Sequence, residues 1–496
     1  MQYYVTQHQM QAIEQDTITN TGIPSLVLME RAALAVADVV EEYIHDQKLV
    51  EKEVIQILCG KGNNGADGIA IGRLLTQRGY LVSIITIGDP TKATKEYIIQ
   101  EDIARKLEIP LISWQEWQPN PNGCIVDGIF GIGLTREITG EYKELIKMVQ
   151  VHACSHIIAI DVPSGIHANT GSVLGCAIKV AVTVTFAYGK VGLILGQGKE
   201  YAGKVIIAQI GLDENSIVRV GYTGKVLEEI DLTQIPQRRE DANKGTYGKL
   251  LMIAGSKGMS GAAYLCAKAA YRMGAGLVKL LTVEENRAIL QMQLPEAIVV
   301  TYHESNLGVV LAQECQWATT VLIGSGIGQD SYVRQLVEIT MKLCGNRIPM
   351  VLDSDALNTI AHDKQLEQLY SKNMVITPHM KEMSRLRKQE VDVIKSDAVA
   401  MCKDYSTKHG ITCLLKDSTS VITNEIGETY LNLSGNSALA KAGTGDVLAG
   451  MVAGLLCLGM SPIKAAAFAS YLHGKAGVKQ SMLHGKHGVM AGDLLE

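Results

Sequence analysis

The stretch Val54–Gly68 reads VIQILCGKGNNGADG and decides the fold of the first half of the chain. An apolar run, a glycine-rich turn and a helical pattern from about Ala66 are typical of a strand, a turn and a helix. Glycines let the backbone approach a phosphate closely. The free amides and the positive dipole end of the following helix attract anions. The stretch therefore predicts an α/β domain that binds a phosphate-bearing ligand at this turn.

More strands and helices surround this turn. Two helices are expected before it, and Thr6 with Gln9 fits a capping box at the first. Apolar runs with helical patterns between most of them follow at Leu81–Ile87, Cys124–Val126, His156–Ile160 and Val180–Phe186. Strands that alternate with helices favour a mostly parallel sheet covered on both faces.

The glycine-rich turn alone leaves alternatives open. It also fits the pattern G-x-G-x-x-G, and Asp89 stands about where a ribose-binding acid would, so a dehydrogenase is one alternative. A plain strand-to-helix turn without a ligand is another. Against both, Asn63, Asn64 and Asp67 put three polar side chains into the turn.

Two further strand ends carry aspartate, in VDGIFGIG at Val126–Gly133 and IDVPSG at Ile160–Gly165. In a parallel sheet such ends meet at one crevice. Oxygen atoms of Asn64, Asp127 and Ser164 could hold a hard cation there.

A second strand and helix series begins near residue 249 and predicts a second α/β domain. Its expected strands are Lys249–Ala254, Val278–Thr282, Ala318–Ile323, Pro349–Leu352, Met374–Ile376 and Thr412–Leu415, with a hairpin at Thr419–Thr423 and Glu428–Leu433. We expect one domain over residues 1–215, a connection over 216–235 and a second domain over 236–496.

The most informative motif of the second half is GNSALAKAGTGD at Gly435–Asp446, which runs into the apolar helical stretch Val447–Met460. Bare amides at the start of a buried helix form an anion hole suited to a phosphoryl group. Asp446, in the first turn, could take the proton of a hydroxyl that attacks phosphorus. An ordinary helix start with an acidic first turn is the alternative. The P-loop motif is absent from the sequence, which excludes a P-loop enzyme.

Composition excludes several classes of protein. The 496 residues carry a net charge of -5 and no long basic run, which argues against nucleic-acid binding. The ten cysteines form no Cys-x-x-Cys pair, as expected for reduced thiols in a cytoplasmic protein. The N-terminus lacks the features of a signal peptide, and the longest apolar run is shorter than the ~20 residues of a membrane span.

The three turns of the first half, GKGNNGADG, VDGIFGIGLTRE and IDVPSG, resemble the signature turns of the NAD(P)H-hydrate epimerase (YjeF N-terminal) family, which has a Rossmann-like fold. The likeness covers residues 1–215, with Ala66 where a glycine is usual. It implies that Asp161 transfers a proton and that Asn64, Asp127 and Ser164 bind K⁺. The substrate-binding residues that it implies are Asn63, Asn64, Gly65, Ala66, Asp67, Gly131, Ile132, Gly133, Leu134, Thr135, Arg136, Glu137, Tyr142 and Asp161.

The second half resembles the ribokinase-like superfamily. Its motifs KGTYG, GSGIG, LDSDALN, TPHMKE and GNSALAKAGTGDVLAG are most similar to the ADP-dependent NAD(P)H-hydrate dehydratase family, over residues 236–496. The resemblance implies that Asp446 is the catalytic base and also contacts the substrate, with Ala262, Gly326 and His379. The ADP-binding residues that it implies are Lys416, Asp417, Ser418, Thr419, Ser420 and Gly445.

Together the resemblances imply two three-layer α/β/α domains and a bifunctional repair enzyme for the hydrates NADHX and NADPHX. The first domain would interconvert the R and S hydrates. The second would dehydrate the S form at the expense of ADP, with Mg²⁺, and the chain would form a homo-oligomer, a tetramer or octamer. A ribokinase-like hydroxyl kinase with a nucleotide-binding first domain is the main alternative. A chain in which one domain only binds is another.

Overall fold

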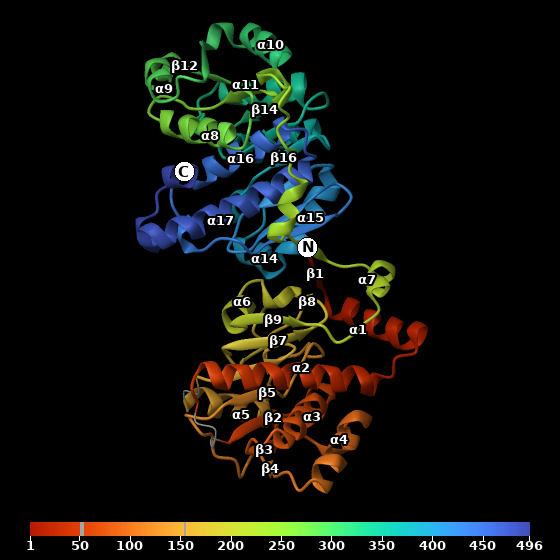
Figure 1. Ribbon diagram of the computed structural model, residues 1–496. Helices are drawn as coiled ribbons and strands as arrows, with labels where there is room; N and C mark the ends of the chain where they lie inside the picture. The colour runs from red at the N-terminus through yellow and green to blue at the C-terminus, as the bar shows by residue number, and fades with distance from the viewer. Residues whose placement is uncertain (50–53, 153–154) are drawn as a thin grey trace. The chain divides into compact units, whose positions relative to one another are not determined.

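The computed structural model describes residues 1–49, 54–152 and 155–496. Contacts divide the chain into two compact units, Gln2–Thr223 and Met1 with Gly224–Glu496 (Figure 1). Each unit has its own sheet and core. Among the described residues, no helix is both long enough and apolar enough to cross a bilayer.

The sheet of the first unit has seven strands, all parallel, in the order β4-β3-β2-β5-β6-β7-β9. The strands are β2 (Ile55–Cys59), β3 (Val82–Thr86), β4 (Leu111–Ser113), β5 (Ile125–Gly128), β6 (Ile157–Ile160), β7 (Val182–Phe186) and β9 (Lys204–Ala208). Two short strands outside this sheet, β1 (Gln2–Val5) and β8 (Gly189–Lys190), pair in parallel with each other.

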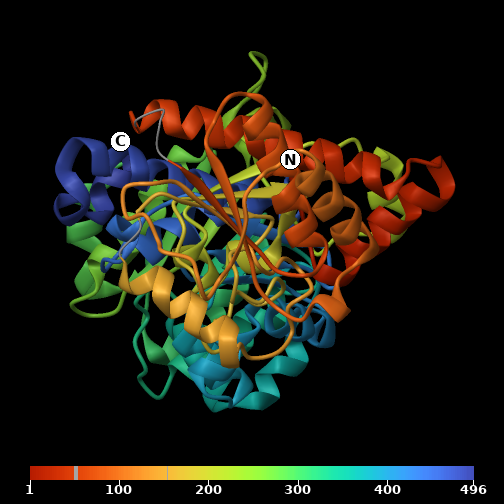
Figure 2. The ribbon, with the colours of Figure 1, turned by 90° about the horizontal axis from the view of Figure 1, so that it is seen from below.

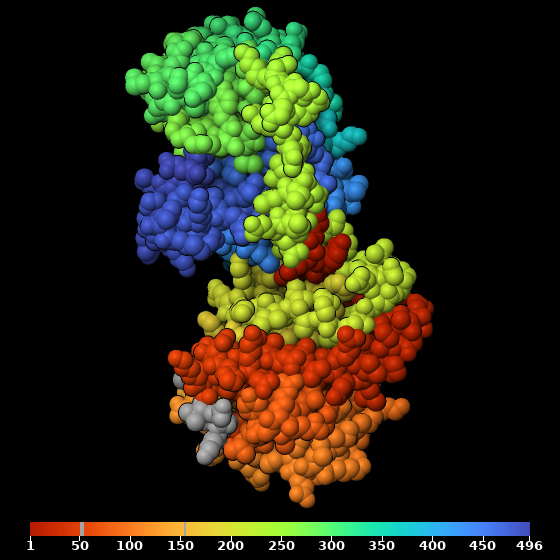
Figure 3. Space-filling view, in the orientation of Figure 1, coloured from red at the N-terminus to blue at the C-terminus, as the bar shows by residue number. Residues whose placement is uncertain are grey.

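Helices cover both faces of this sheet. They are α1 (Gln7–Asp16), α2 (Ser25–Asp46), α3 (Asn63–Gln77), α4 (Lys95–Lys106), α5 (Gly140–Val151), α6 (Gly198–Tyr201) and α7 (Glu214–Val220). Apolar residues of α2, α3 and α4 pack against Ile57 and Val126 on one face. Residues of α5 pack against Leu58 and Ile125 on the other. Figure 2 shows α2 and α5 on opposite sides of the strands, and Figure 3 shows the outward side of α2 at the surface. The three layers place the carboxyl ends of the strands at one open edge.

The order of strands fixes where a ligand can bind. The chain passes from β2 outward to β3 and β4 and then returns to the other side of β2 at β5. A crevice opens where the order reverses, at the carboxyl ends of these two strands. Residues 60–64 follow β2 and residues 129–136 follow β5, so the two glycine-rich loops lie at this point.

The second unit contributes ten strands to one sheet, in the order β13-β12-β11-β14-β15-β16-β17-β18-β19-β10. They are β10 (Gly224–Val226), β11 (Lys249–Ile253), β12 (Leu277–Val283), β13 (Ile298–Tyr302), β14 (Thr320–Ile323), β15 (Met350–Leu352), β16 (Met374–Ile376), β17 (Thr412–Leu415), β18 (Ser420–Thr423) and β19 (Thr429–Asn432). The strands from β13 to β17 are parallel, and β17, β18 and β19 are antiparallel. The order again reverses, between β11 and β14.

The helices of the second unit are α8 (Ser260–Arg272), α9 (Arg287–Gln293), α10 (Leu307–Trp317), α11 (Val333–Cys344), α12 (Asp355–His362), α13 (Met380–Arg387), α14 (Val391–Ser396), α15 (Ala398–His409), α16 (Thr444–Cys457) and α17 (Pro462–Gly488). The core under α8, α16 and α17 is rich in alanine and glycine. Their small size lets α16 pack directly against α8. At Gly450 of α16, an added Cβ would lie 2.1 Å from the carbonyl oxygen of Cys266 in α8. This close packing fixes the start of α16.

The α/β fold class and the positions of the main strands are confirmed. The capping box at Thr6 and Gln9 is present. Helix α3 begins at Asn63, three residues before the expected Ala66, because the polar turn residues themselves form its first turn. The short edge strands β4 and β9 and the strand β13 were not predicted. The nine described cysteines form no disulfide, and Cys154 lies outside the described residues.

Candidate active sites

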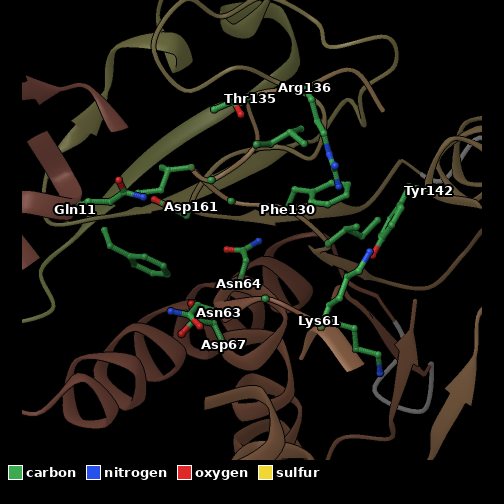
Figure 4. A pocket seen from close by; sticks show the side chains of 18 of the residues that line it. Gln11, Lys61, Asn63, Asn64, Asp67, Phe130, Thr135, Arg136, Tyr142 and Asp161 are labelled. Atoms are coloured by element: carbon green, nitrogen blue, oxygen red, sulfur yellow. The ribbon is translucent and has the colours of Figure 1, made fainter. Parts of the chain in front are cut away.

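The first unit holds a cavity of about 750 Å³ at its switch point, lined from α1, from the turn after β2 and from the loop after β5 (Figure 4). Its lining includes most of the residues expected to bind substrate in this half of the chain. These are Asn63, Asn64, Asp67, Gly131, Ile132, Gly133, Leu134, Thr135, Arg136, Tyr142 and Asp161.

The other residues expected to bind substrate here, Gly65, Ala66 and Glu137, are not part of the cavity lining. A Cβ added at Gly65 would stand 1.8 Å from the carbonyl oxygen of Gly60, so only glycine lets α3 start this close to β2. Ala66 is fully buried and its methyl group packs into the core, away from the loop. Glu137 is exposed. The alanine in place of the usual glycine is thus accommodated by the core.

The expected K⁺ ligands lie together, in a compact polar cluster. The Ser164 hydroxyl donates to Asp127 Oδ1 at 2.6 Å, and the Ser164 backbone amide donates to Asp127 Oδ2 at 2.8 Å. Burial raises the pKa of Asp127 to about 6. The Asn64 side-chain amide is buried, and its Nδ2 has no hydrogen-bond partner within the described protein. Turning this amide over would leave an oxygen without a partner, as a hard cation requires. The residues therefore fit a K⁺ ion.

Asp161 is held in an unusual conformation at the cavity. Its backbone φ is +63°, a region that residues other than glycine rarely adopt and that occurs mainly where function requires it. Its Oδ1 forms an ion pair with Lys190 Nζ at 2.7 Å and accepts a hydrogen bond from Thr185 at 2.9 Å. Lys190 is fully buried and also donates to the carbonyl of Phe186 at 2.9 Å. The pair gives the cavity a fixed carboxylate.

Two further carboxyl groups line the same cavity. Burial raises the pKa of Glu14 to about 7, with Lys190 opposing and Asp161 adding to this shift. Burial also raises the pKa of Asp67 well above its usual range, and the negative charges of Asp161 and Glu14 add to the effect. The sequence analysis missed Glu14 and Lys190. A lysine next to a glycine just after an expected strand was the one signal for Lys190, whereas Glu14 lay in an ordinary helical pattern.

Positive side chains line another part of the cavity. Lys61, Lys92 and Arg136 are in its lining, and Figure 4 shows Lys61, Arg136 and Tyr142 on one side with Gln11 and Asp161 on the other. Lys61 Nζ is held by the Tyr97 hydroxyl at 2.8 Å. The cavity thus has a cationic part suited to phosphates and an acidic part suited to proton transfer.

The site of the second unit is built around the N-terminus of α16. Gly443 caps this helix with φ +89°, a left-handed conformation that a side chain would disfavour. Asp446 lies in the first turn, half-buried. Burial, together with the charge of Asp353, raises the pKa of Asp446 to about 6. A hydrogen bond from Ser325 and the charge of Lys416 oppose this shift. A carboxylate with this pKa can accept a proton at neutral pH.

Asp353, Lys416 and Thr377 form a polar cluster beside Asp446. Lys416 Nζ lies 3.1 Å from Asp353 Oδ1, which also accepts from the Thr377 hydroxyl at 2.6 Å. Lys416 Nζ would lie 3.7 Å from a Cβ at Gly445, so its ammonium group stands next to the amides that start α16. Asp353 stands in the motif LDSDALN, whose residues alone indicate no role for it.

The expected substrate residues of this unit come from neighbouring loops. A Cβ at Gly326 would lie 3.0 Å from the Cβ of Ala262. His379 pairs with Lys416 in an isolated β-bridge and caps α13, since its Nδ1 accepts from the amides of Lys381 and Glu382. The neutral ring therefore carries its proton on Nε2, which lies 3.5 Å from Glu382 Oε1. Burial and the nearby charge of Lys416 lower the pKa of His379, which favours this neutral form.

The expected ADP-binding residues lie at the end of β17 and in the turn before β18. Lys416 reaches the start of α16, and Asp417 and Ser418 are exposed. Thr419 and Ser420 are buried at the start of β18, and the Ser420 hydroxyl donates to the carbonyl of Asp417 at 3.4 Å. These buried side chains shape the turn, so contact with a nucleotide would fall to the turn's backbone and to its exposed residues.

Comparison with known proteins gives two family matches. Residues 25–192 match the YjeF-related protein N-terminus, and residues 250–496 match NAD(P)H-hydrate dehydratase. The bifunctional NAD(P)H-hydrate repair enzyme of Moorella thermoacetica is 32% identical over 100% of this chain and 95% of its own. The Escherichia coli enzyme of the same name is 32% identical over 88% of this chain and 83% of its own.

A solved ribokinase-like superfamily protein from Enterococcus faecalis is similar to the second unit. It is 28% identical, with a TM-score of 0.51, over 55% of this chain and 93% of that protein. The two family matches and the full-length relatives agree with one candidate site in each unit. The chain belongs to the family of bifunctional NAD(P)H-hydrate repair enzymes.

Proposed function

We propose that this enzyme repairs hydrated nicotinamide dinucleotides, NADHX and NADPHX, in two steps at two sites. The first unit interconverts the R and S hydrates, and the second dehydrates the S hydrate with ADP. Hydration of the ring gives both epimers, so a dehydratase that accepts one of them needs the epimerase. The observation that carries the proposal is the half-buried Asp446, with a pKa raised to about 6, beside the amides that start α16 and the ammonium group of Lys416.

The first site suits a dinucleotide with a hydroxylated ring. Lys61, Lys92 and Arg136 can bind its phosphates, and the amides at the start of α3 can add hydrogen bonds. The ring then lies toward Asp161, whose carboxylate is fixed by Lys190. Asp161 can move a proton to or from the ring hydroxyl or an attacking water.

The second site suits transfer of a phosphoryl group from ADP. Asp446 takes the proton of the ring hydroxyl while its oxygen attacks the terminal phosphorus, and AMP leaves with the bridging oxygen. The amides at Gly445 and the Lys416 ammonium group stabilise the charge on the phosphoryl oxygens. Phosphate then departs from the ring carbon, and loss of a proton from the adjacent carbon restores the double bond. Hydroxide alone would leave far more slowly.

Ions and assembly complete the proposal. Asn64, Asp127 and Ser164 would hold K⁺, which supplies positive charge near the phosphates. Mg²⁺ would arrive on the nucleotide and neutralise its phosphates. We also propose that the enzyme acts in the cytoplasm as a homo-oligomer, a tetramer or octamer.

An absorbance assay tests the second step alone. Purified S-NADHX, ADP and Mg²⁺ should give NADH with wild-type enzyme, and the products should include AMP and phosphate in equal amounts. Asp446→Asn should produce no NADH. Phosphorylation of sugars or vitamin alcohols by ADP or ATP, with no NADH formed, would instead support the hydroxyl kinase.

A further inference from the structure

Glu14 is a half-buried carboxyl group that the mechanism above does not use. It projects from α1 into the lining of the first-unit cavity, into which Asp161 also projects from a different element. The charged groups that act on it are Lys190, from β8, and Asp161, and its own charge acts on Asp67 of α3. An inversion needs one group to assist the leaving hydroxyl and another to activate the incoming water.

Both ends of α1 are anchored, so Glu14 is held in place. At the start of the helix, the Gln7 amide donates to Asn169 Oδ1 at 2.7 Å. At its end, Asp16 accepts from the Ser216 hydroxyl at 2.6 Å and forms an ion pair with Arg219 at 2.5 Å. A proton-transfer group on a rigid element keeps the geometry that catalysis requires.

The two carboxyl groups differ in environment. Asp161 forms an ion pair with Lys190 at 2.7 Å and accepts a hydrogen bond from the Thr185 hydroxyl. Burial raises the pKa of Glu14 to about 7, so a large share of it carries a proton at neutral pH. One carboxyl group is paired with a cation and the other readily holds a proton. Two such groups at one cavity can act as base and acid.

We infer that Glu14 is the second catalytic residue of the epimerase, acting as the acid opposite the base Asp161. This inference rests on the proposed function of the first unit. It adds a group that faces the reacting ring from α1.

The chemistry balances without a further reactant. Glu14 gives its proton to the ring hydroxyl, the carbon–oxygen bond breaks, and water departs while the ring nitrogen's lone pair forms a carbon–nitrogen double bond. Asp161 then takes a proton from a water that attacks the other face of the ring. The new carbon–oxygen bond forms as the electron pair returns to nitrogen. One proton has moved from Glu14 to Asp161, and proton exchange with solvent water returns both groups to their starting states before the next turnover.

The test measures exchange of the separated hydrates with the full-length enzyme. R-NADHX is supplied without ADP, and formation of the S hydrate is followed by chromatography, corrected for exchange without enzyme. Glu14→Gln should lower kcat at least ~100-fold with little change in KM. Glu14→Asp, which keeps an acid, should recover part of this loss. Glu42→Gln, which removes an exposed carboxylate of α2, should match the wild type.

The pH profile separates catalysis from structural damage. The wild-type rate should fall above about pH 7, where Glu14 loses its proton, and Glu14→Gln should lack this decline. Exchange by Glu14→Gln within ~3-fold of the wild type, or an unchanged decline above pH 7 in that variant, would overturn the inference. This result would not contradict the proposed epimerase activity. Only a wild-type enzyme that exchanges no hydrate would contradict that activity.

Discussion

Asp446 sets the pH dependence of the second step. Burial and the charge of Asp353 raise its pKa to about 6, and a base acts only when ionised. We therefore expect kcat/KM for S-NADHX to rise about tenfold per pH unit below about pH 6 and to level off above it. Initial rates of NADH formation between about pH 5 and pH 8 check this. A rate that falls as the pH rises through this range would contradict the role of base.

Lys190 and Asp161 form an ion pair that should stabilise the first unit. Removing one partner of a buried ion pair leaves an uncompensated charge and typically costs 3–5 kcal/mol. We expect Lys190→Met to lower the free energy of unfolding of the first unit by about 3 kcal/mol, measured by urea denaturation. The double variant Lys190→Met, Asp161→Asn should be less destabilised than the single one. Additive losses would show that the two groups do not interact.

Single residues divide into those that the sequence could predict and those that it could not. Asp161 and Asp446 follow from local patterns, because each stands at a strand end or helix start with a recognisable motif. Glu14 reaches the first cavity, and Lys190 reaches Asp161, only through the long-range folding of α1 and β8. A single sequence carries no sign of such long-range contacts. Which nitrogen of His379 carries the proton also became clear only from its cap on α13.

At the scale of elements, glycines set how closely helices and strands approach. Gly450 in α16 faces the backbone of α8 with no room for a side chain. Gly450→Ala should lower the free energy of unfolding of the second unit by about 1–3 kcal/mol and reduce dehydratase activity, because α16 must shift. Gly308→Ala is the matched control. It lies in α10 with open space around it and should stabilise by up to about 1 kcal/mol.

Thermal and urea unfolding of both variants check this prediction. A Gly450→Ala protein as stable as the wild type would mean that α16 and α8 are less tightly packed than described. The sequence predicted the long elements well, because buried parallel strands are continuous apolar runs. It missed β4 and β9, at the edges of the first sheet, since short, partly exposed strands carry little pattern.

The whole molecule carries two sites on two separate sheets. Each site should therefore work when the other is disabled. We expect full-length Asp161→Asn and full-length Asp446→Asn, mixed in equal amounts, to convert R-NADHX to NADH in the presence of ADP, although neither converts it efficiently alone. The R hydrate is epimerised by one chain and dehydrated by the other. A mixture no faster than the Asp161→Asn chain alone would mean that the sites depend on each other.

Racemic NADHX with excess ADP and Mg²⁺ tests the central claim most directly, with NADH followed by absorbance. The wild type should convert the whole mixture to NADH, Asp161→Asn should stop near half apart from slow spontaneous exchange, and Asp446→Asn should convert none. Recovery of no NADH by the wild-type enzyme would contradict the account, as would full conversion by Asp446→Asn.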